Sequence, residues 1–276
     1  MKKRQRGTAV IAAMLVAALA ATAASFALER QHLAVSALEV GRDRDQARWA
    51  LRGGAHWART ILQEDARSTA IDHGGELWAS GLPPTDIDNG TLAGRIADQQ
   101  GLLNLANLRR DGAPSERDIA MLRRLLAALG LRVELADAIA ARAPVAEIEE
   151  LYQVRGFDEA TLARLRQFAT VLPRRTPVNV NTAPAEVLVA LVDGLTLAEA
   201  MVLAHDRRTA PMRESAEFRA RLPRADLVLN SEDMSVQSRF FLVEGRAKVG
   251  RAEARLQALL ERQGVALPAI VWQRIS

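Results

Sequence analysis

The stretch MKKRQRG-TAVIAAMLVAALAATAASFAL, residues 1–28, decides the fold of this chain. Its first seven residues are basic, and Thr8 to Leu28 contains no charged side chain. In an α-helix such a segment spans about 32 Å, close to the bilayer core of about 30 Å. Because a basic flank stays in the cytoplasm, the sequence predicts that the bulk of the chain crosses the membrane.

Three interpretations of this N-terminus fit the residues. The small residues Ala20 to Ser25 allow an ordinary cleaved signal peptide, and the apolar run by itself allows a plain signal anchor. The third is a leader of the type IV pilin kind, which is cut after a glycine on the cytoplasmic side of the apolar run. Gly7 directly precedes that run, so we favour a cut between Gly7 and Thr8.

The sequence continues as a helix well beyond the apolar segment. Glu29 to about Arg67 contains no proline, and Gly53-Gly54 weakens the helix locally. Apolar residues recur at helical spacing between charges, for example Leu33, Ala37, Ala47, Leu51, Ala55, Ala58 and Leu62. A helix of about 60 residues, apolar at first and amphipathic later, is typical of a pilin stalk.

The charge distribution does not favour a nucleic-acid-binding surface. The chain carries 37 basic and 33 acidic side chains, a formal net charge of +4. Lys2, Lys3, Arg4 and Arg6 supply this excess, so the rest of the chain is formally neutral. Phosphate binding needs a basic excess on one face.

The remaining sequence predicts β structure on both sides of a helical segment. Asp72 to Asn89 is predicted as loop, and Leu92 to Leu108 as strands with a hairpin turn at Gly101. Phe240 to Val249 and Ala252 to Leu260 alternate apolar and polar residues, and a last strand is expected at 269–275. Between these regions we expect helices at 115–129, where Ser115 and Asp118 form a variant capping box, and at 135–143, 145–154, 159–171, 184–192, 197–207 and 215–221.

Four segments, in this order, resemble the K-type minor pseudopilins of the type II secretion system. They are the leader, GRIADQQGLLNLANL (94–108), PVNVNTAPAEVL (177–188) and SRFFLVEGRAKVG (238–250). The family pattern D-x-x-G-x-x-N-x-x-x-L corresponds to Asp98, Gly101, Asn104 and Leu108. The third segment contributes Asn179, Asn181 and Pro184. The resemblance implies a structural role for these seven residues.

The resemblance implies an α+β, type IV pilin-like fold. We expect a long N-terminal transmembrane and stalk helix, an antiparallel sheet, and a large all-helical domain of the SAM-like or helix-hairpin-helix kind inserted in the sheet. The expected divisions are a leader at 1–7, a membrane segment at 8–28, a stalk at 29–67, a first β part at 68–108, the helical insert at 109–226 and a second β part at 227–276.

The implied function is that of a minor pseudopilin in the tip complex that starts the pseudopilus and supports export of folded proteins. The implied partners are the I and J types, then the H type, the major pseudopilin, and a prepilin peptidase that cuts after Gly7 and methylates Thr8. The chain would be a single-pass inner-membrane protein with its head in the periplasm. A minor pilin of a type IV pilus is the alternative within this class.

Ala12 occupies the fifth position after the expected cut. Most pilins and pseudopilins have a glutamate there, whereas K-type subunits lack it. A buried carboxylate without a partner is costly. Its absence therefore agrees with a subunit at the filament tip, beyond which no further subunit lies; chance loss in a divergent pilin is the competing interpretation.

The sequence identifies no metal ligand. Calcium has been associated with the helical domain of the family, but Asp137 to Glu150 lacks a dense cluster of aspartates, and no EF-hand loop is present. Asp86 and Asp88, beside Asn89-Gly90, are interpreted as turn residues. We expect no other cofactor, and the absence of cysteine excludes thiolate sites.

Two other classes of protein remain as alternatives. Residues 151–165 and 180–203 resemble helix-hairpin-helix units, which in a membrane-anchored protein would suggest DNA binding. Each unit keeps a single turn glycine, Gly156 or Gly194, so a structural or protein-contact role is favoured. No catalytic motif is present, and the four histidines are far apart in sequence, which argues against an enzyme.

Overall fold

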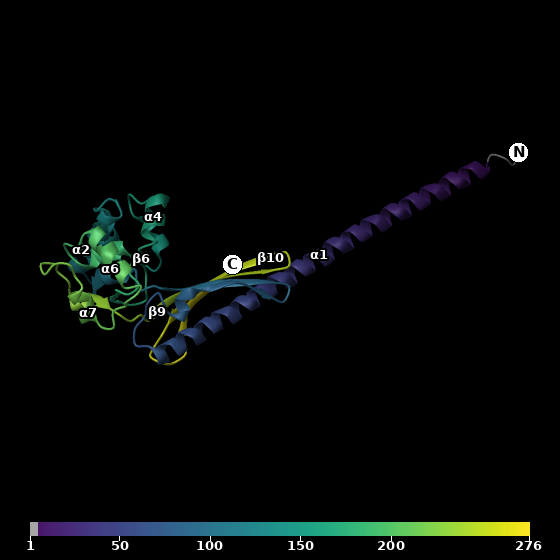
Figure 1. Cartoon of the computed structure of the whole chain (residues 1–276). Helices are drawn as coiled ribbons and strands as arrows, with labels where there is room; N and C mark the ends of the chain where they lie inside the picture. Colours follow the sequence, from purple (N-terminus) through teal and green to yellow (C-terminus); the bar gives the residue numbers. More distant parts are fainter. Residues whose placement is uncertain (1–4) are drawn as a thin grey trace.

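A single long helix carries the rest of the molecule. The computed structural model describes residues 5–276, with side chains from Ala9 onward, so Lys2, Lys3 and Arg4 of the expected leader lie outside the described residues. Helix α1 (Gln5–Ser68) has 64 residues and ends within a residue of the predicted position. In Figure 1 its first half extends away from the folded head, and its second half lies along the sheet.

The head contains one five-stranded antiparallel sheet of order β1-β2-β9-β10-β11. Strand β2 pairs with β9 from Gly90 opposite Val249 to Asp98 opposite Phe241. Segments on either side of the helical region therefore share one sheet, which confirms the expected inserted arrangement. The strands are β1 (Leu82–Ile87), β2 (Gly90–Asp98), β9 (Phe240–Val249), β10 (Ala252–Glu261) and β11 (Ala269–Ile275).

The second half of α1 packs on one face of this sheet. The helix buries small and medium side chains spaced three or four residues apart, which are Ala47, Leu51, Ala55, Ala58 and Leu62. Strands β9 and β10 contribute every second residue, because side chains alternate between the two faces of a strand; these are Phe241, Val243, Ala247, Val249, Ala254, Leu256, Ala258 and Leu260. Trp78 lies at one end of this core in an edge-to-face contact with Phe241, with the two ring centroids 5.3 Å apart.

Most of the chain between β2 and β9 forms a separate domain with its own core, here called the helical domain (Figure 1). Its helices are α2 (Glu116–Ala128), α3 (Leu135–Arg142), α4 (Glu159–Leu165), α5 (Ala185–Leu191), α6 (Leu197–Asp206) and α7 (Ser215–Ala220). Four 3₁₀ turns complete the helical elements of the head: η1 (Leu77–Ser80), η2 (Leu105–Leu108), η3 (Ile148–Gln153) and η4 (Ser231–Asp233).

The helical domain differs from the prediction in extent and in content. Its core includes Leu103 and Leu108 before the expected boundary at 109, and Leu229 and Val236 after the expected boundary at 226. It also contains short pairings, parallel between β3 (Leu103–Asn104) and β6 (Ala169–Thr170), antiparallel between β4 (Arg109–Arg110) and β5 (Ala113–Pro114), and parallel between β7 (Val178–Asn179) and β8 (Met234–Ser235). The domain is therefore mainly helical and not all-helical.

Two local predictions about the β region are wrong. Gly101 does not form a hairpin turn: β2 ends at Asp98, and Leu103 pairs instead with Ala169 in the helical domain. The predicted loop at 72–89 contains η1 and the edge strand β1, whose side chains are mostly exposed and show no alternating burial. Asp86 belongs to β1, opposite Thr91, whereas Asp88 lies in the two-residue turn before β2, as expected.

Ser115 lies at the N-cap position of α2, but it does not form the predicted capping box. Its hydroxyl bonds the carboxylate of Asp118 and accepts no backbone N–H of the helix. Arg175 also contacts this carboxylate, which holds it away from the helix end. A complete capping box occurs at α6, where Thr196 and Glu199 exchange bonds with each other's backbone N–H.

Candidate functional site: the domain junction and the stalk surface

Asp98 is the centre of a polar network where the sheet meets the helical domain. Its Oδ2 accepts hydrogen bonds from Asn179 Nδ2 (2.9 Å), Thr182 Oγ1 (2.6 Å) and Ser238 Oγ (2.7 Å). Its Oδ1 accepts from the backbone N–H of Gln100 at 2.8 Å. These partners come from the segment after β2, the helical domain and the segment before β9, so one carboxylate connects both crossings between the domains.

Asn179 is fully buried and extends this network. Its amide nitrogen also lies 3.0 Å from the Asp72 carbonyl and 3.0 Å from Ser238 Oγ, and its Oδ1 accepts from Asn181 N–H at 3.0 Å. The group of Asp72, Asp98, Asn179, Thr182 and Ser238 is called the junction network below. A buried amide that uses both its donor and acceptor sides specifies the relative position of the segments it joins.

The structure explains why the family pattern has glycine at position 101. A Cβ on Gly101 would lie 2.7 Å from Thr182 Oγ1 and 3.1 Å from the Thr182 carbonyl carbon. Thr182 is the residue that donates to Asp98, so a larger side chain would push it out of the junction network. Gly101 is therefore required by close approach and not by a turn.

Asn104 and Leu108 belong to the helical domain and not to the sheet. The amide of Asn104 donates to Arg174 O (2.8 Å) and Thr176 Oγ1 (3.1 Å), and its Oδ1 accepts from the N–H groups of Ala106 and Leu172. Leu108 is 1% exposed in the domain core. Asn104 therefore fixes the first crossing to the segment at 172–176.

Asn181 and Pro184 order the start of α5. The Asn181 side chain makes two bonds with the backbone of Met212, donating to its carbonyl at 2.8 Å and accepting from its N–H at 2.9 Å. Pro184 is the N-cap residue of α5, and its carbonyl accepts from Val187 and Leu188. The seven motif residues therefore form two groups: Asp98, Gly101 and Asn179 act at the junction, and the other four act inside the helical domain.

Sequence reasoning missed the arginine that completes the junction. Arg262, at the end of β10, bonds both carboxylate oxygens of Asp72 and lies 2.8 Å from Asp65 Oδ2 at the end of α1. It also donates to Ser238 O at 2.9 Å. Asp65 and Asp72, together with Glu76, are the one group of three carboxylates within the described residues whose oxygens lie close enough to share a metal ion, and Arg262 supplies a cation to two of them.

Burial raises the pKa of several of these carboxyl groups. Desolvation, and then repulsion from Glu76 and Asp72, raises the pKa of Asp65 to about 6, against the opposing effect of Arg262. Desolvation also raises the pKa of Asp72 and of Asp98, although Arg262 lowers the first and hydrogen bonds from Ser238 and Thr182 lower the second. The three buried carboxyl groups of Asp65, Asp72 and Asp98 therefore carry more negative charge, when ionised, than Arg262 alone neutralises.

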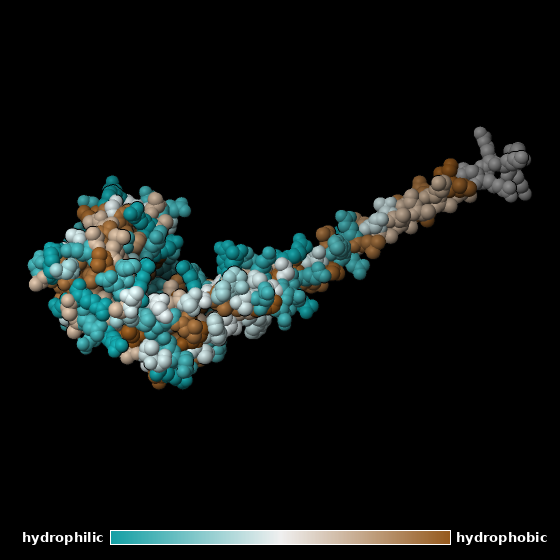
Figure 2. Space-filling view, viewed as in Figure 1, coloured by the Kyte–Doolittle hydropathy of each residue, from teal (hydrophilic) through white to brown (hydrophobic). Residues whose placement is uncertain are grey.

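The exposed half of α1 is suited to a bilayer. Within the described residues, α1 is the one helix long and apolar enough to cross a membrane, and its most apolar part is not buried against the head. Figure 2 shows apolar residues gathered on this part of α1. The backbone at Gly7 and Thr8 is helical, but the side chain of Thr8 lies outside the described residues; Ala12 is exposed on the apolar segment.

Near the head, α1 carries large apolar side chains on the surface that does not face the sheet. Leu38, Trp49 and Trp57 are 74%, 67% and 51% exposed. At 100° per residue, Trp49 lies on the side of the helix opposite Leu51, which faces the sheet. The stalk therefore has two apolar sides, of which the head covers one.

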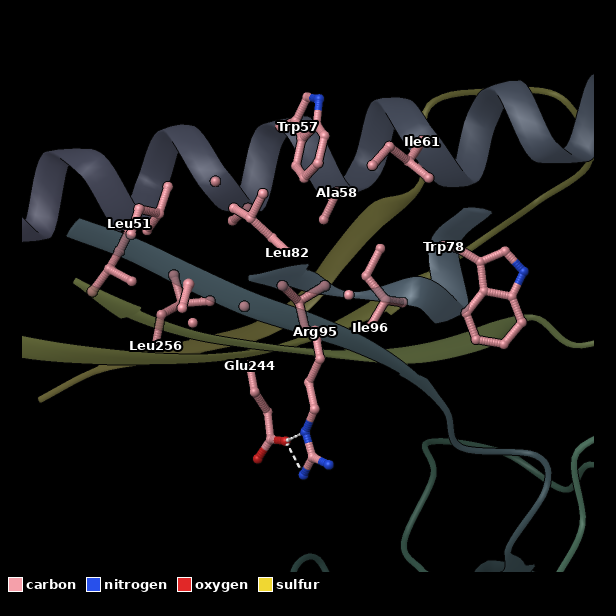
Figure 3. A pocket seen from close by; sticks show the side chains of 18 of the residues that line it. Leu51, Trp57, Ala58, Ile61, Trp78, Leu82, Arg95, Ile96, Glu244 and Leu256 are labelled. Carbon is pink, nitrogen blue, oxygen red and sulfur yellow. Dashed lines mark hydrogen bonds and ion pairs between the residues drawn. The ribbon is translucent and has the colours of Figure 1, made fainter. Parts of the chain in front are cut away.

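A hollow runs beside these tryptophans, between α1 and the first two strands. It is lined by Trp49, Gly53, Trp57, Leu82 and Leu92, among others, has a volume of about 560 Å³, and is called the stalk groove below. It continues into an apolar cavity of about 120 Å³ under α1. In Figure 3, Leu51 and Ile61 point into this cavity, whereas paired Arg95 and Glu244 extend from the opposite face of the sheet.

The acidic residues of the segment where the family resemblance suggested calcium are paired with arginines. Four carboxylates between 137 and 150 make such contacts. The pairs are Asp137 with Arg123, Glu147 with Arg274, Glu149 with Arg166, and Glu150 with Arg142. Asp86 and Asp88 belong to the β1–β2 hairpin instead. Among the described residues, these six carboxylates do not form a shared ligand set.

Comparisons with known proteins agree with this architecture. A family model described as "Type II secretion system (T2SS), protein K" matches residues 178–237. Three relatives named type II secretion system protein K match nearly the whole chain. That of Pseudomonas aeruginosa is 27% identical, over 95% of this chain and 90% of its own length. Those of Pectobacterium carotovorum and Klebsiella pneumoniae are each 26% identical, over 96% of this chain and 94% of their own lengths.

Over nearly its whole length, the chain is similar to protein K of the type II secretion system. Its function is that of a minor pseudopilin. A solved structure, the GspK-GspI-GspJ complex from enterotoxigenic Escherichia coli, contains a chain of the same fold, with a TM-score of 0.71 and 20% identity over 86% of this chain and 98% of that one. The α+β, pilin-like fold expected of a K-type pseudopilin is thereby confirmed.

Proposed function

We propose that this K-type pseudopilin occupies the tip of a pseudopilus, where it joins I- and J-type subunits and starts filament assembly. The observation that carries the proposal is the second apolar side of α1, together with the stalk groove. The related structure from Escherichia coli was solved as a complex of K, I and J proteins, which supports partners of these types.

The stalk surface has the chemistry of a helix-docking site. Two exposed tryptophans lie eight residues apart on α1, and Gly53 between them has nothing within 4 Å of where a Cβ would be. A partner helix can therefore approach the backbone of α1 closely at Gly53 while the indoles pack on either side. Large apolar side chains that are exposed beside a hollow are typical of protein interaction surfaces.

The adjacent sheet edge disfavours docking of a strand. Pro83 and Pro84 lie in the edge strand β1, and proline has no backbone N–H to donate. A helix is therefore the better fit to this side of the molecule. The stalk of another pseudopilin is such a helix.

Two features support the tip over an interior position. Ala12 supplies no carboxylate within the apolar segment for the amino group of a neighbouring subunit. The helical domain projects beyond the sheet, away from the far end of α1, and enlarges the head (Figure 1). Both features fit an end of the filament better than a packed shaft.

The proposed topology follows from the N-terminal charges. The basic residues before Gly7 stay in the cytoplasm, α1 anchors the chain in the inner membrane, and the head lies in the periplasm. The proposed work of the head is assembly and protein contact, without catalysis. Removal of residues 1–7 by a prepilin peptidase, methylation of Thr8, and later contacts with the H-type and major subunits complete the proposal.

Co-purification of the full chain with I- and J-type subunits from membranes tests the docking surface. Trp57→Ala is expected to weaken binding of the partners about thirtyfold, because a buried aromatic anchor contributes on the order of 2 kcal/mol. Tyr152→Ala is the matched control, since Tyr152 is a similarly exposed aromatic on the helical domain. Equal recovery with both variants would contradict the proposed groove.

Counting labelled copies on isolated pseudopili tests the position. A tip subunit gives a single label at one end, and labels spaced along the shaft rule the tip position out. Ala12→Glu adds a second comparison. A tip subunit gains nothing from the new carboxylate, so improved incorporation of this variant would contradict the proposal.

A further inference from the structure

A second hollow, here called the junction cleft, opens where the helical domain meets the end of the sheet. Its volume is about 830 Å³, within the range of known ligand sites. One wall comes from the segment at 73–79, and the other from one side of α6 and the residues after it. The side chains that matter below are His73, Trp78, Met201, His205, Arg207 and Arg208.

Arg207 lacks an acidic partner in this cleft. Its Nη1 donates to the Val180 carbonyl at 2.5 Å, which is the one side-chain hydrogen bond that it makes with the described residues. Asp206, next to it in sequence, forms no ion pair with it among the described residues. Desolvation, and then repulsion from Arg208, lowers the pKa of Arg207 to about 10. A partly buried guanidinium with free N–H groups is costly unless an anion pairs with it.

The other charged groups around Arg207 leave an excess of positive charge. Arg208 and His205 lie beside it on the α6 side, and both are exposed. His73, opposite, uses Nδ1 to accept a bond from Gly75 N–H, so its proton-bearing nitrogen is Nε2, 3.8 Å from Glu76. Glu76 is itself engaged by Thr69, Trp78 and the backbone of His73.

Asp98 is the one acidic residue that lines the cleft, and it is already occupied. Its two oxygens accept four hydrogen bonds within the junction network, and none comes from Arg207. It is therefore poorly placed to neutralise the arginines. The cleft is left with donors for one further carboxylate.

The rest of the lining is apolar. Trp78, Pro184, Ala185, Met201 and Ala204 surround the basic groups, and Met201 is 60% exposed. This combination suits a carboxylate flanked by apolar side chains better than a free phosphate, which favours several polar donors and no apolar contact.

We propose that the junction cleft binds an acidic peptide segment of another protein, with a carboxylate on Arg207 and Arg208 and an adjacent apolar side chain on Trp78 and Met201. A guanidinium and a carboxylate pair through two parallel hydrogen bonds, which gives such a site direction as well as affinity. The cleft is separate from the stalk groove, so this binding is independent of the proposed docking of subunits.

Calorimetric titration of the full chain in detergent tests the site with two peptides, acetyl-Ala-Leu-Glu-Ala-amide and its Gln counterpart. The Glu peptide is expected to bind about tenfold more tightly, as a charge-assisted bond predicts. Equal affinities, or no heat with the Glu peptide at millimolar concentration, overturn the proposal. Inorganic phosphate that displaces the Glu peptide at equal concentration would show a simple anion site and would also overturn it.

Three variants locate the binding. Arg207→Gln is expected to abolish the preference for the Glu peptide, whereas Arg213→Gln, at an exposed arginine outside the cleft, keeps it. Met201→Glu introduces a competing carboxylate at an exposed position, so it weakens binding without disturbing the core. An unchanged preference in both Arg207→Gln and Met201→Glu, with unchanged circular dichroism, places binding elsewhere and overturns the assignment.

Discussion

Asp98 shows how one side chain determines the geometry of the junction. Its carboxyl group pays a desolvation cost, which raises its pKa, yet four donors from three parts of the chain converge on it. Asn179 has further acceptors in the Asp72 carbonyl and Ser238 Oγ, so the carboxylate is the group that its bonds share with those of Thr182 and Ser238. A network of this kind specifies position more than it adds stability, because its bonds replace bonds to water.

Asp98→Asn is expected to lower the free energy of unfolding by about 1–3 kcal/mol. An amide oxygen in the place of Oδ2 turns the NH₂ group towards the N–H of Gln100, and the opposite orientation turns it towards Thr182 and Ser238. Chemical denaturation of the full chain in detergent measures the change. The control is Asp226→Asn, at a carboxylate 72% exposed, where a change within about 0.5 kcal/mol is expected.

The raised pKa of Asp65 predicts how stability depends on pH. The pKa is about 6 in the folded chain and 3.8 in the reference state, so between these values the folded chain binds more protons. Unfolding free energy should therefore increase as the pH falls from 7 towards 5. The surrounding charged groups are Asp72, Glu76 and Arg262, and the raised pKa of Asp72 acts in the same direction.

Denaturation at a series of pH values tests this prediction, with Asp65→Asn as the comparison. The variant cannot take up a proton at this position, so its unfolding free energy should depend less steeply on pH between 7 and 5. The difference in slope corresponds to the uptake of up to about one proton per molecule. Parallel curves for the two proteins would show that Asp65 does not titrate in this window.

At the scale of the elements, the two halves of α1 have different surroundings. Its first part has no cover in the monomer, and its second part has one side on the sheet and a second side that exposes Trp49 and Trp57. The small residues Ala47, Ala55 and Ala58 let the sheet approach closely, and Leu51 and Leu62 between them fill the core. The division between the two sides is visible in the helical periodicity of the sequence.

The segment around α3 and η3 provides a prediction about metal. Because its carboxylates contact arginines, addition of 1 mM calcium or of EDTA is expected to change the melting temperature by less than about 1 °C. Thermal unfolding of the full chain in detergent measures this. A rise of several degrees with calcium would contradict it, and loss of that rise in Glu150→Gln but not in Glu76→Gln would then locate the ion in this segment.

For the whole molecule, the helical domain enters and leaves the sheet through two adjacent strands. The chain leaves the sheet after β2 and returns at β9, and these two strands pair with each other. A second large core is therefore added without interrupting the sheet. The junction network joins the two crossings between the sheet and the helical domain. A fixed connection between the two domains keeps the stalk groove and the junction cleft in a constant relative position when both face partners.

The mature protein is expected to begin at Thr8. Gly7 is the last residue before the uncharged run, which is where a prepilin peptidase would cut. Intact-mass measurement of membrane-extracted protein decides this. A start near Ser25 would mean an ordinary signal peptide, and would remove the membrane anchor on which the pseudopilin assembly depends.

The sequence by itself determined the features that depend on local periodicity. The uncharged run predicted a long apolar helix, the spacing of Leu51, Ala55 and Leu62 predicted the sheet-facing side of α1, and alternation predicted β9 and β10. Most helices of the helical domain were predicted within a few residues of their ends. Each of these signals arises because neighbouring residues share one helix or strand.

Only the tertiary structure decided how these parts meet. Arg262 bonds Asp72 from 190 residues away, Gly101 is required by contact with Thr182, and the largely exposed strand β1 is held by its pairing with β2. None of these has a local pattern, since the partners are brought together by the fold and not by the spacing of residues. Family resemblance singled out Asp98 and Asn179, but the physical reason for them is a shared network that exists only once both crossings are in place.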